Sequence, residues 1–149
     1  MPCSSDEVTH FARGRFAPHG AMQVEQHGSV LVGHCYGPFN LEFVQAYGRM
    51  WAAHFAGWTG APALILLTVW HDSAMATPEA IGCFRELMAL AARTLPADTL
   101  HLWLMPEDLE GASLTLPSWT AAMTDNGLAV EVLRNEAAVQ QRIDQHLGR

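Results

Sequence analysis

The spacing of hydrophobic residues changes several times along the chain, and the changes predict alternating strands and helices. Two β-like runs, Ala21 to Gln26 and Ser29 to Tyr36, are separated by His27-Gly28. Because a glycine in a two-residue loop supplies the positive φ of a tight turn, these runs are predicted to pair as an antiparallel hairpin. The most hydrophobic run is Ala63 to Trp70, and a short continuous run of this kind is typical of an interior strand covered on both faces.

Apolar residues at three- and four-residue steps predict the helices. Asn40 is a suitable N-cap for the first helix, and Thr77-Pro78-Glu79 places an N-cap, a proline and an acid at the start of the second, which ends before Pro96. The apolar stripe of the first helix is unusually wide. Its members are Phe43, Val44, Tyr47, Met50, Trp51, His54, Phe55 and Trp58.

The rest of the chain continues the alternation. Strands are predicted over Thr99 to Met105 and Ala129 to Leu133, a short helix over Pro117 to Asp125, and a final helix that follows Asn135. The order is therefore ββαβαβαβα, which predicts an α/β domain whose sheet is mainly parallel, with an antiparallel first hairpin, and is flanked by helices. Residues 1–20 are predicted to be a polar, partly flexible leader, and residues 21–149 one domain.

The composition excludes several classes of function but does not identify one. The chain is 50% hydrophobic and 15% charged, with a formal net charge of −7. This charge disfavours nucleic acid as a partner. The sequence contains no lysine, which excludes Walker-type phosphate loops and pyridoxal Schiff bases, and no cofactor is predicted.

The amino terminus and the longest apolar run predict a cytoplasmic location. Met1 to Glu7 carries acidic residues where a signal peptide needs a basic start. The longest apolar stretch, Ala61 to Trp70, is far shorter than the roughly 20 residues that span a bilayer. The three cysteines are widely spaced and fit a reducing compartment.

Candidate chemistry is concentrated after the strand that ends at Trp70. Ligands of open α/β sheets bind outside the carboxyl ends of the strands, so Trp70, His71, Asp72 and Ser73 are candidate binding residues. The same loop, through His71, Asp72 and Ser73, is the alternative site of a small enzyme. The histidines lack the spacing of a metal motif, and no metal site is predicted.

The aromatic stripe of the first helix is a second candidate surface. Core packing explains most of it, but its width leaves room for Tyr47, Trp51 and Trp58 to line a dimer contact or a pocket for an apolar ligand.

The ordered motifs resemble the SpoIIAA-like branch of the STAS-domain superfamily, the bacterial anti-sigma-factor antagonists. The motifs are Gly28 to Val32 leading into Gly37 to Val44, then Ala63 to Trp70, then Thr77 to Ile81, and finally Glu131 to Val139. The resemblance implies a stand-alone α/β regulatory domain. It also implies a phosphorylation switch at the start of the second helix, where only the hydroxyl of Thr77 matches, without the family's preceding acid and following glycine.

These observations together predict a non-catalytic SpoIIAA-like module that binds a partner protein or a small apolar ligand and forms a homodimer. The alternatives are the small enzyme using His71, Asp72 and Ser73, and a phospho-regulated antagonist acting through Thr77.

Overall fold

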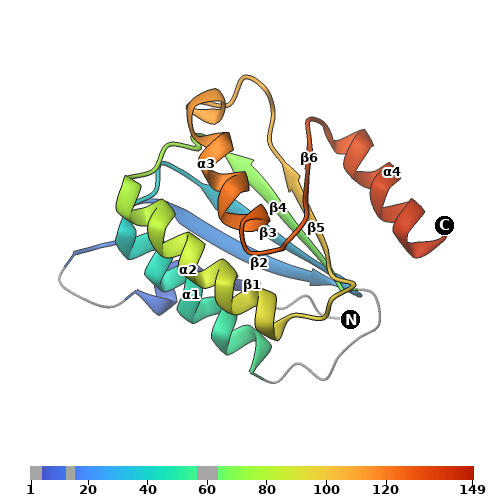
Figure 1. The fold of residues 1–149 in the computed structure, drawn as a ribbon, viewed down its shortest axis with the longest axis horizontal. Coiled ribbons are helices and arrows are strands. Elements are labelled where there is room, and N and C mark those ends of the chain that lie inside the picture. The colour runs from blue at the N-terminus through green and yellow to red at the C-terminus, as the bar shows by residue number, and fades with distance from the viewer. Residues whose placement is uncertain (1–4, 13–15, 57–63) are drawn as a thin grey trace.

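The computed structural model describes residues 5–12, 16–56 and 64–149, without the side chains of residues 5–7, 9 and 10. These residues form one mixed sheet of six strands whose spatial order is the order of the chain (Figure 1). The β1–β2 and β2–β3 pairs are antiparallel, and the β3–β4, β4–β5 and β5–β6 pairs are parallel. The strands are β1 (Ser5–Glu7), β2 (Ala21–His27), β3 (Val30–Tyr36), β4 (Ile65–His71), β5 (Leu100–Leu104) and β6 (Val130–Leu133).

The predicted α/β class and the antiparallel hairpin are confirmed, with the turn one residue later than predicted. His27 pairs with Val30, so the two-residue loop is Gly28-Ser29 instead of His27-Gly28. Gly28 has a φ of 62°, which a glycine adopts without steric cost. The hairpin therefore places Gly28 first in the loop, where a tight turn needs positive φ.

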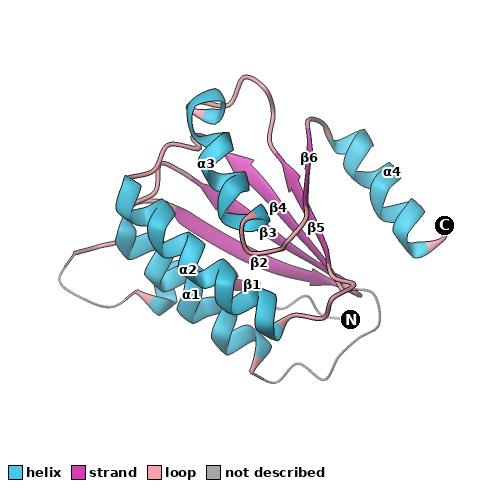
Figure 2. Ribbon diagram, viewed as in Figure 1, coloured by secondary structure: helices cyan, strands magenta, loops and turns pink. Residues whose placement is uncertain are grey.

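Three crossover helices and a short 3₁₀ turn pack on one face of the sheet, and the fourth helix packs on the other (Figure 2). Consecutive parallel strands joined by right-handed crossovers put every crossover helix on the same side. The helices are α1 (Leu41–Phe55), α2 (Pro78–Thr94), α3 (Ala112–Thr124) and α4 (Glu136–Leu147), and the 3₁₀ turn is η1 (Val8–Phe11).

β4 is an interior strand between β3 and β5, as predicted. Helices reach both of its faces, although unevenly, because Ile65 and Leu67 are buried in a cluster with Val139 and Ile143 of α4. α1, α2 and α3 cover one face, whereas α4 lies over β5 and β6 on the other (Figure 1). Leu64 and Ile65 are almost completely buried, and Val69 is only half-buried. Ala63, the first residue of the predicted run, lies outside the described residues.

Two segments differ from the sequence prediction. The leader contains β1, which pairs with β2, and η1, whose Val8 is completely buried in the core. α3 begins at Ala112 and contains Pro117 within it, whereas the sequence predicted a helix that starts at that proline. Thr115 and Trp119 both donate to the carbonyl of Ala74, so hydrogen bonds to the loop after β4 fix this helix.

No helix in the described part of the chain combines the length and apolar character that crossing a bilayer requires.

Candidate functional site

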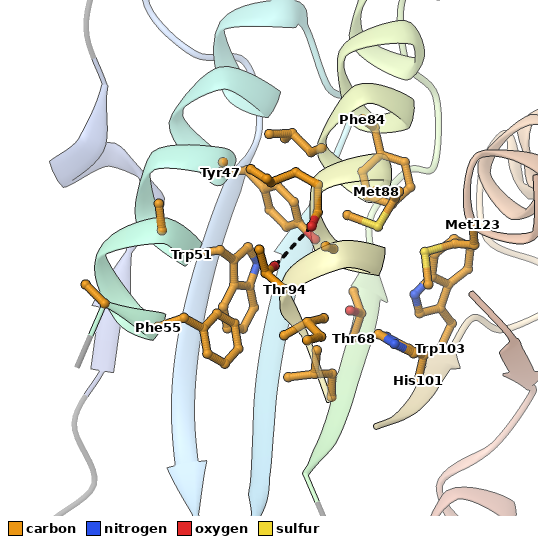
Figure 3. Close-up of a pocket in the computed structure, with 18 residues that line it drawn as sticks. Tyr47, Trp51, Phe55, Thr68, Phe84, Met88, Thr94, His101, Trp103 and Met123 are labelled. Carbon is orange, nitrogen blue, oxygen red and sulfur yellow. Dashed lines mark hydrogen bonds between the residues drawn. The ribbon is translucent and has the colours of Figure 1, made fainter. Parts of the chain in front are cut away.

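An apolar pocket of about 360 Å³ lies between α1, α2 and the sheet (Figure 3). Trp51 and Phe55 come from the last turns of α1, and Ala91 comes from the last part of α2. His101 is the second residue of β5. The pocket therefore lies toward the amino ends of the parallel strands, the end of the sheet opposite the loop that follows β4.

The pocket wall is apolar and carries no formal charge. Its residues are aromatic, aliphatic, glycine, threonine, methionine and one histidine, and none is Asp, Glu, Lys or Arg. A cavity of this size, mostly apolar and with a few polar groups, has the general form of a small-molecule site. The side chains labelled in Figure 3 are Tyr47, Trp51, Phe55, Thr68, Phe84, Met88, Thr94, His101, Trp103 and Met123.

Gly48 allows the two helical walls to come close. A Cβ atom at this position would lie 2.8 Å from Cδ2 of Leu87, a side chain of α2 that also lines the pocket. That separation is shorter than the ordinary van der Waals contact between carbon atoms. The absence of a side chain at Gly48 therefore leaves room for Leu87 of α2 to pack directly against the α1 backbone.

The two ionisable side chains of the pocket are held in their neutral forms. Burial is the main cause that raises the pKa of the Tyr47 hydroxyl, and Cys35 adds to the rise. Burial lowers the pKa of the His101 imidazole. Both shifts disfavour the charged form, as expected for groups in an apolar cavity.

Of the three residues of the first helix predicted to line a pocket or a dimer contact, the structure describes Tyr47 and Trp51. Tyr47 and Trp51 line the pocket, with ring centroids 6.2 Å apart in an edge-to-face arrangement. The Trp51 Nε1–H is buried without a hydrogen-bond partner among the described residues. Trp58 lies outside the described residues. The stripe of α1 thus contributes a wall of the pocket, as well as core residues.

Trp70 belongs to the aromatic core instead of the pocket wall. Its ring centroid lies 5.3 Å from that of Trp103 and 5.2 Å from that of Trp119, both in edge-to-face geometry. The side chain is 6% exposed. Its burial is therefore explained by packing between β4, β5 and α3.

The loop after β4 brings His71 close to β3. Its Nε2 lies 3.0 Å from Nδ1 of His34, and its ring stacks on Tyr36 with a centroid distance of 4.6 Å. Burial, followed by the proximity of His34, lowers the pKa of His71, although Asp72 acts in the opposite direction. Asp72 is exposed and has a φ of 66°.

Ser73 is held by structural hydrogen bonds. Its hydroxyl donates to Oε1 of Glu110 at 2.9 Å and accepts from the N–H of Met75 at 3.0 Å. The side chain is 2% exposed. Because His71 bonds to His34 and Ser73 bonds to Glu110, the described loop does not join a histidine to a hydroxyl nucleophile, which the enzymatic alternative requires.

Thr77 is exposed and caps α2, where its Oγ1 accepts from the N–H of Ala80 at 3.1 Å. This is the N-cap role that the sequence predicts. Phosphorylation of Thr77 stays a prediction from the family resemblance.

The described side chains contain no group of three or more His, Cys, Asp or Glu residues placed to hold a metal ion.

The sequence reasoning did not identify Thr68, His101 and Trp103 as pocket residues. Thr68 was part of the hydrophobic run, and His101 and Trp103 were assigned only to one face of an alternating strand. One signal was available: His101 lies in a strand whose other residues are mostly apolar. A polar side chain in such a strand is costly to bury without a partner, so it indicates a site where a partner could bind.

No family model, curated protein or solved structure matches this chain in the comparisons.

Proposed function

We propose that this protein is a non-catalytic binding module that takes up a small, mostly apolar molecule in the α1–α2 pocket. The observation that supports it is a cavity of about 360 Å³ lined by uncharged side chains. A liquid water molecule occupies roughly 30 Å³, so the cavity has room for about a dozen water-sized groups. Burial of apolar ligand surface against Phe84, Met88 and Trp103 supplies the driving force.

A matched pair of variants on α2 tests this proposal. Ala91 lines the pocket, whereas the adjacent Ala92 is exposed and is not a lining residue. Ala91→Phe fills the cavity, and Ala92→Phe adds the same side chain outside it. We expect decanol to change the tryptophan fluorescence of the native protein because Trp51 and Trp103 line the pocket.

The expected result is at least a tenfold loss of decanol affinity in Ala91→Phe and none in Ala92→Phe. Circular dichroism and urea unfolding of both variants verify that each is folded. Equal decanol binding by the two variants, or no binding by the native protein, would refute the pocket as the binding site.

Self-association is a second proposal, supported by the sheet face opposite α1. Val30, Val32 and Val69 are half-buried on this face, and α4 packs over β5 and β6. Half-exposed valines on adjacent strands form an apolar surface that a second copy of the chain can cover. This proposal keeps the homodimer expected from the sequence, with the sheet as its interface instead of the first helix.

We also propose that the fold belongs to the SpoIIAA-like branch of the STAS superfamily. The support is the ordered set of motifs, together with the mixed α/β sheet that begins with antiparallel strands. An experimental structure that superimposes on a SpoIIAA-like domain over β2 to α4 is the test, and a different strand order would reject the assignment.

A further inference from the structure

Three polar side chains are buried in the described part of the chain, and one of them lacks a hydrogen bond. Ser73, Thr115 and His101 are between 2% and 8% exposed. Ser73 bonds to Glu110, and Thr115 bonds to the carbonyl of Ala74. The imidazole of His101 has no hydrogen-bond partner among the described residues and lines the pocket. Its ring nitrogens are not among the fully enclosed unpartnered atoms of the described residues, so they are reachable from the pocket, where water or a ligand can bind them.

Thr68 provides a second free polar group beside His101. Thr68 pairs with Trp103 and His101 pairs with Leu66, so both side chains project from adjacent strands onto the same face of the sheet. Both line the pocket, and Figure 3 shows them next to each other. The Thr68 hydroxyl also has no partner among the described side chains and backbone groups. In contrast, Thr94, near the end of α2, donates its hydroxyl to the carbonyl of Leu90.

The hydrogen-bonding capacity of these two groups defines the ligand that fits. A neutral imidazole offers one donor and one acceptor, and a threonine hydroxyl offers one donor and two acceptor lone pairs. Their match is a hydroxyl or carbonyl group. A carboxylate or an ammonium group would lose its hydration without meeting an opposite charge, because none of the described residues that line the pocket is charged.

We propose, resting on the proposed function, that the ligand is an uncharged amphiphile whose single hydroxyl or carbonyl group binds His101 and Thr68, with its apolar body between α1 and α2. The polar end lies against the sheet, and the apolar body contacts Trp51, Phe55 and Leu87, all of which line the cavity.

Three probes with the same hydrocarbon chain test this specificity at pH 8: decanol, decanoate and decane. The native protein is expected to bind decanol at least tenfold more tightly than decanoate. Thr68→Val and His101→Phe each remove a polar group while keeping the side chain similar in size. Each variant is expected to weaken decanol binding about two- to tenfold, the range for one hydrogen bond, without weakening the binding of decane.

The outcomes separate this inference from the proposed function. Decanoate that binds as tightly as decanol, or variants that leave the ratio of decanol to decane affinity unchanged, would refute the polar anchor while leaving the apolar pocket intact. Binding of none of the three probes to the native protein would refute both. Thr68→Val keeps the test decisive if His101→Phe does not fold, because its shape matches threonine.

Discussion

The hydroxyl of Ser73 shows how one buried side chain holds the loop after β4 to the segment before α3. It joins the N–H of Met75 to the carboxylate of Glu110. The backbone N–H of Ala74 also donates to the carbonyl of Glu110. The loop is therefore fastened by both backbone and side chain.

Ser73→Ala is expected to lower the free energy of unfolding by about 1–3 kcal/mol, because the buried Ser73 hydroxyl no longer bonds to the Glu110 carboxylate and the Met75 N–H. Urea unfolding followed by circular dichroism measures the loss. Ser118→Ala, on the exposed side of α3, is the matched control and is expected to change stability little. Equal effects of the two substitutions would contradict the assigned role of Ser73.

The buried imidazole of His101 makes stability depend on pH. Burial lowers its pKa from the ordinary value of 6.5, so the unfolded chain binds a proton at a higher pH than the folded protein does. The free energy of unfolding is therefore expected to fall as the pH drops below about 6.5, down to the lower pKa of the folded state.

Urea unfolding between pH 7.5 and 5 measures this effect in the native protein and in His101→Phe. The variant lacks the His101 contribution, so its stability is expected to fall less steeply with decreasing pH. His71, whose pKa is also lowered, contributes in the same direction to both proteins. Parallel curves would show that His101 does not contribute.

Roles of individual residues were predictable from sequence where a local rule decided them. Asn40 and Thr77 cap their helices as predicted because an N-cap depends on the next few residues. Ser73 and His101 were different. Their surroundings are assembled from segments far apart in the chain, such as Glu110 for Ser73 and Trp51 for the pocket around His101.

Asparagine is the N-cap of both α1 and α4, and the N-cap of α1 makes more hydrogen bonds. Oδ1 of Asn40 accepts from the N–H groups of Phe43 and His19, and its Nδ2 donates to the carbonyl of Ala17. Oδ1 of Asn135 accepts only from the N–H of Ala138 among its described contacts at the start of α4. Asn40 thus also holds the segment before β2.

Replacement of these two caps by alanine is expected to have unequal effects. Asn135→Ala removes one capping bond, with a cost of about 1 kcal/mol. Asn40→Ala also removes the two bonds to residues 17–19 and is expected to cost more. Chemical unfolding of both variants gives the comparison, and an equal loss would mean that the contacts of Asn40 before β2 add nothing to stability.

Elements with strong local signals were predictable, and those fixed by distant contacts were not. The start of α2 follows from Thr77 and Pro78. The start of α3 does not, because Pro117 suggests a first turn while Thr115 and Trp119 anchor an earlier start through Ala74. β1 has only three residues, which is too short for a periodic pattern, and its pairing with β2 is a contact between distant segments.

The molecule as a whole has two unequal sheet faces. Three helices and η1 cover one face, and α4 covers part of the other. Val32 lies on the less covered face, between Glu25 of β2 and Leu67 of β4 in the register of the strands. Because this face is the proposed dimer interface, a charged side chain at Val32 is the most direct way to disrupt self-association.

Val32→Arg is expected to convert a dimer to a monomer in sedimentation equilibrium, because a guanidinium cannot be buried there without a full set of partners. In the monomer, Glu25 across the β2–β3 pair can partner the new charge. Gln45→Arg, on the exposed face of α1, adds the same charge elsewhere and is expected to leave the dimer intact. A monomeric native protein at micromolar concentration would reject the proposed dimer.

The α/β class was predictable for the whole molecule because the period of hydrophobic residues alternates with the elements. The uneven covering of the sheet was harder to predict. The hydrophobic run of β4 indicates burial but not which helices supply it, because the strand order decides which face each crossover helix covers. The pocket depends on the gap between α1 and α2, and no local pattern encodes that gap.

The strand order also has a consequence for how the chain folds. Each strand lies beside the one that precedes it in sequence, but each parallel pair, such as Val30 with Ile65, forms across a whole crossover. Non-local pairing of this kind is associated with slow folding. A nascent chain leaving the ribosome can add β3, β4 and β5 one after another. The apolar strip of β5 that faces α4 stays open until that helix has been synthesised, which makes this interval the stage most exposed to aggregation.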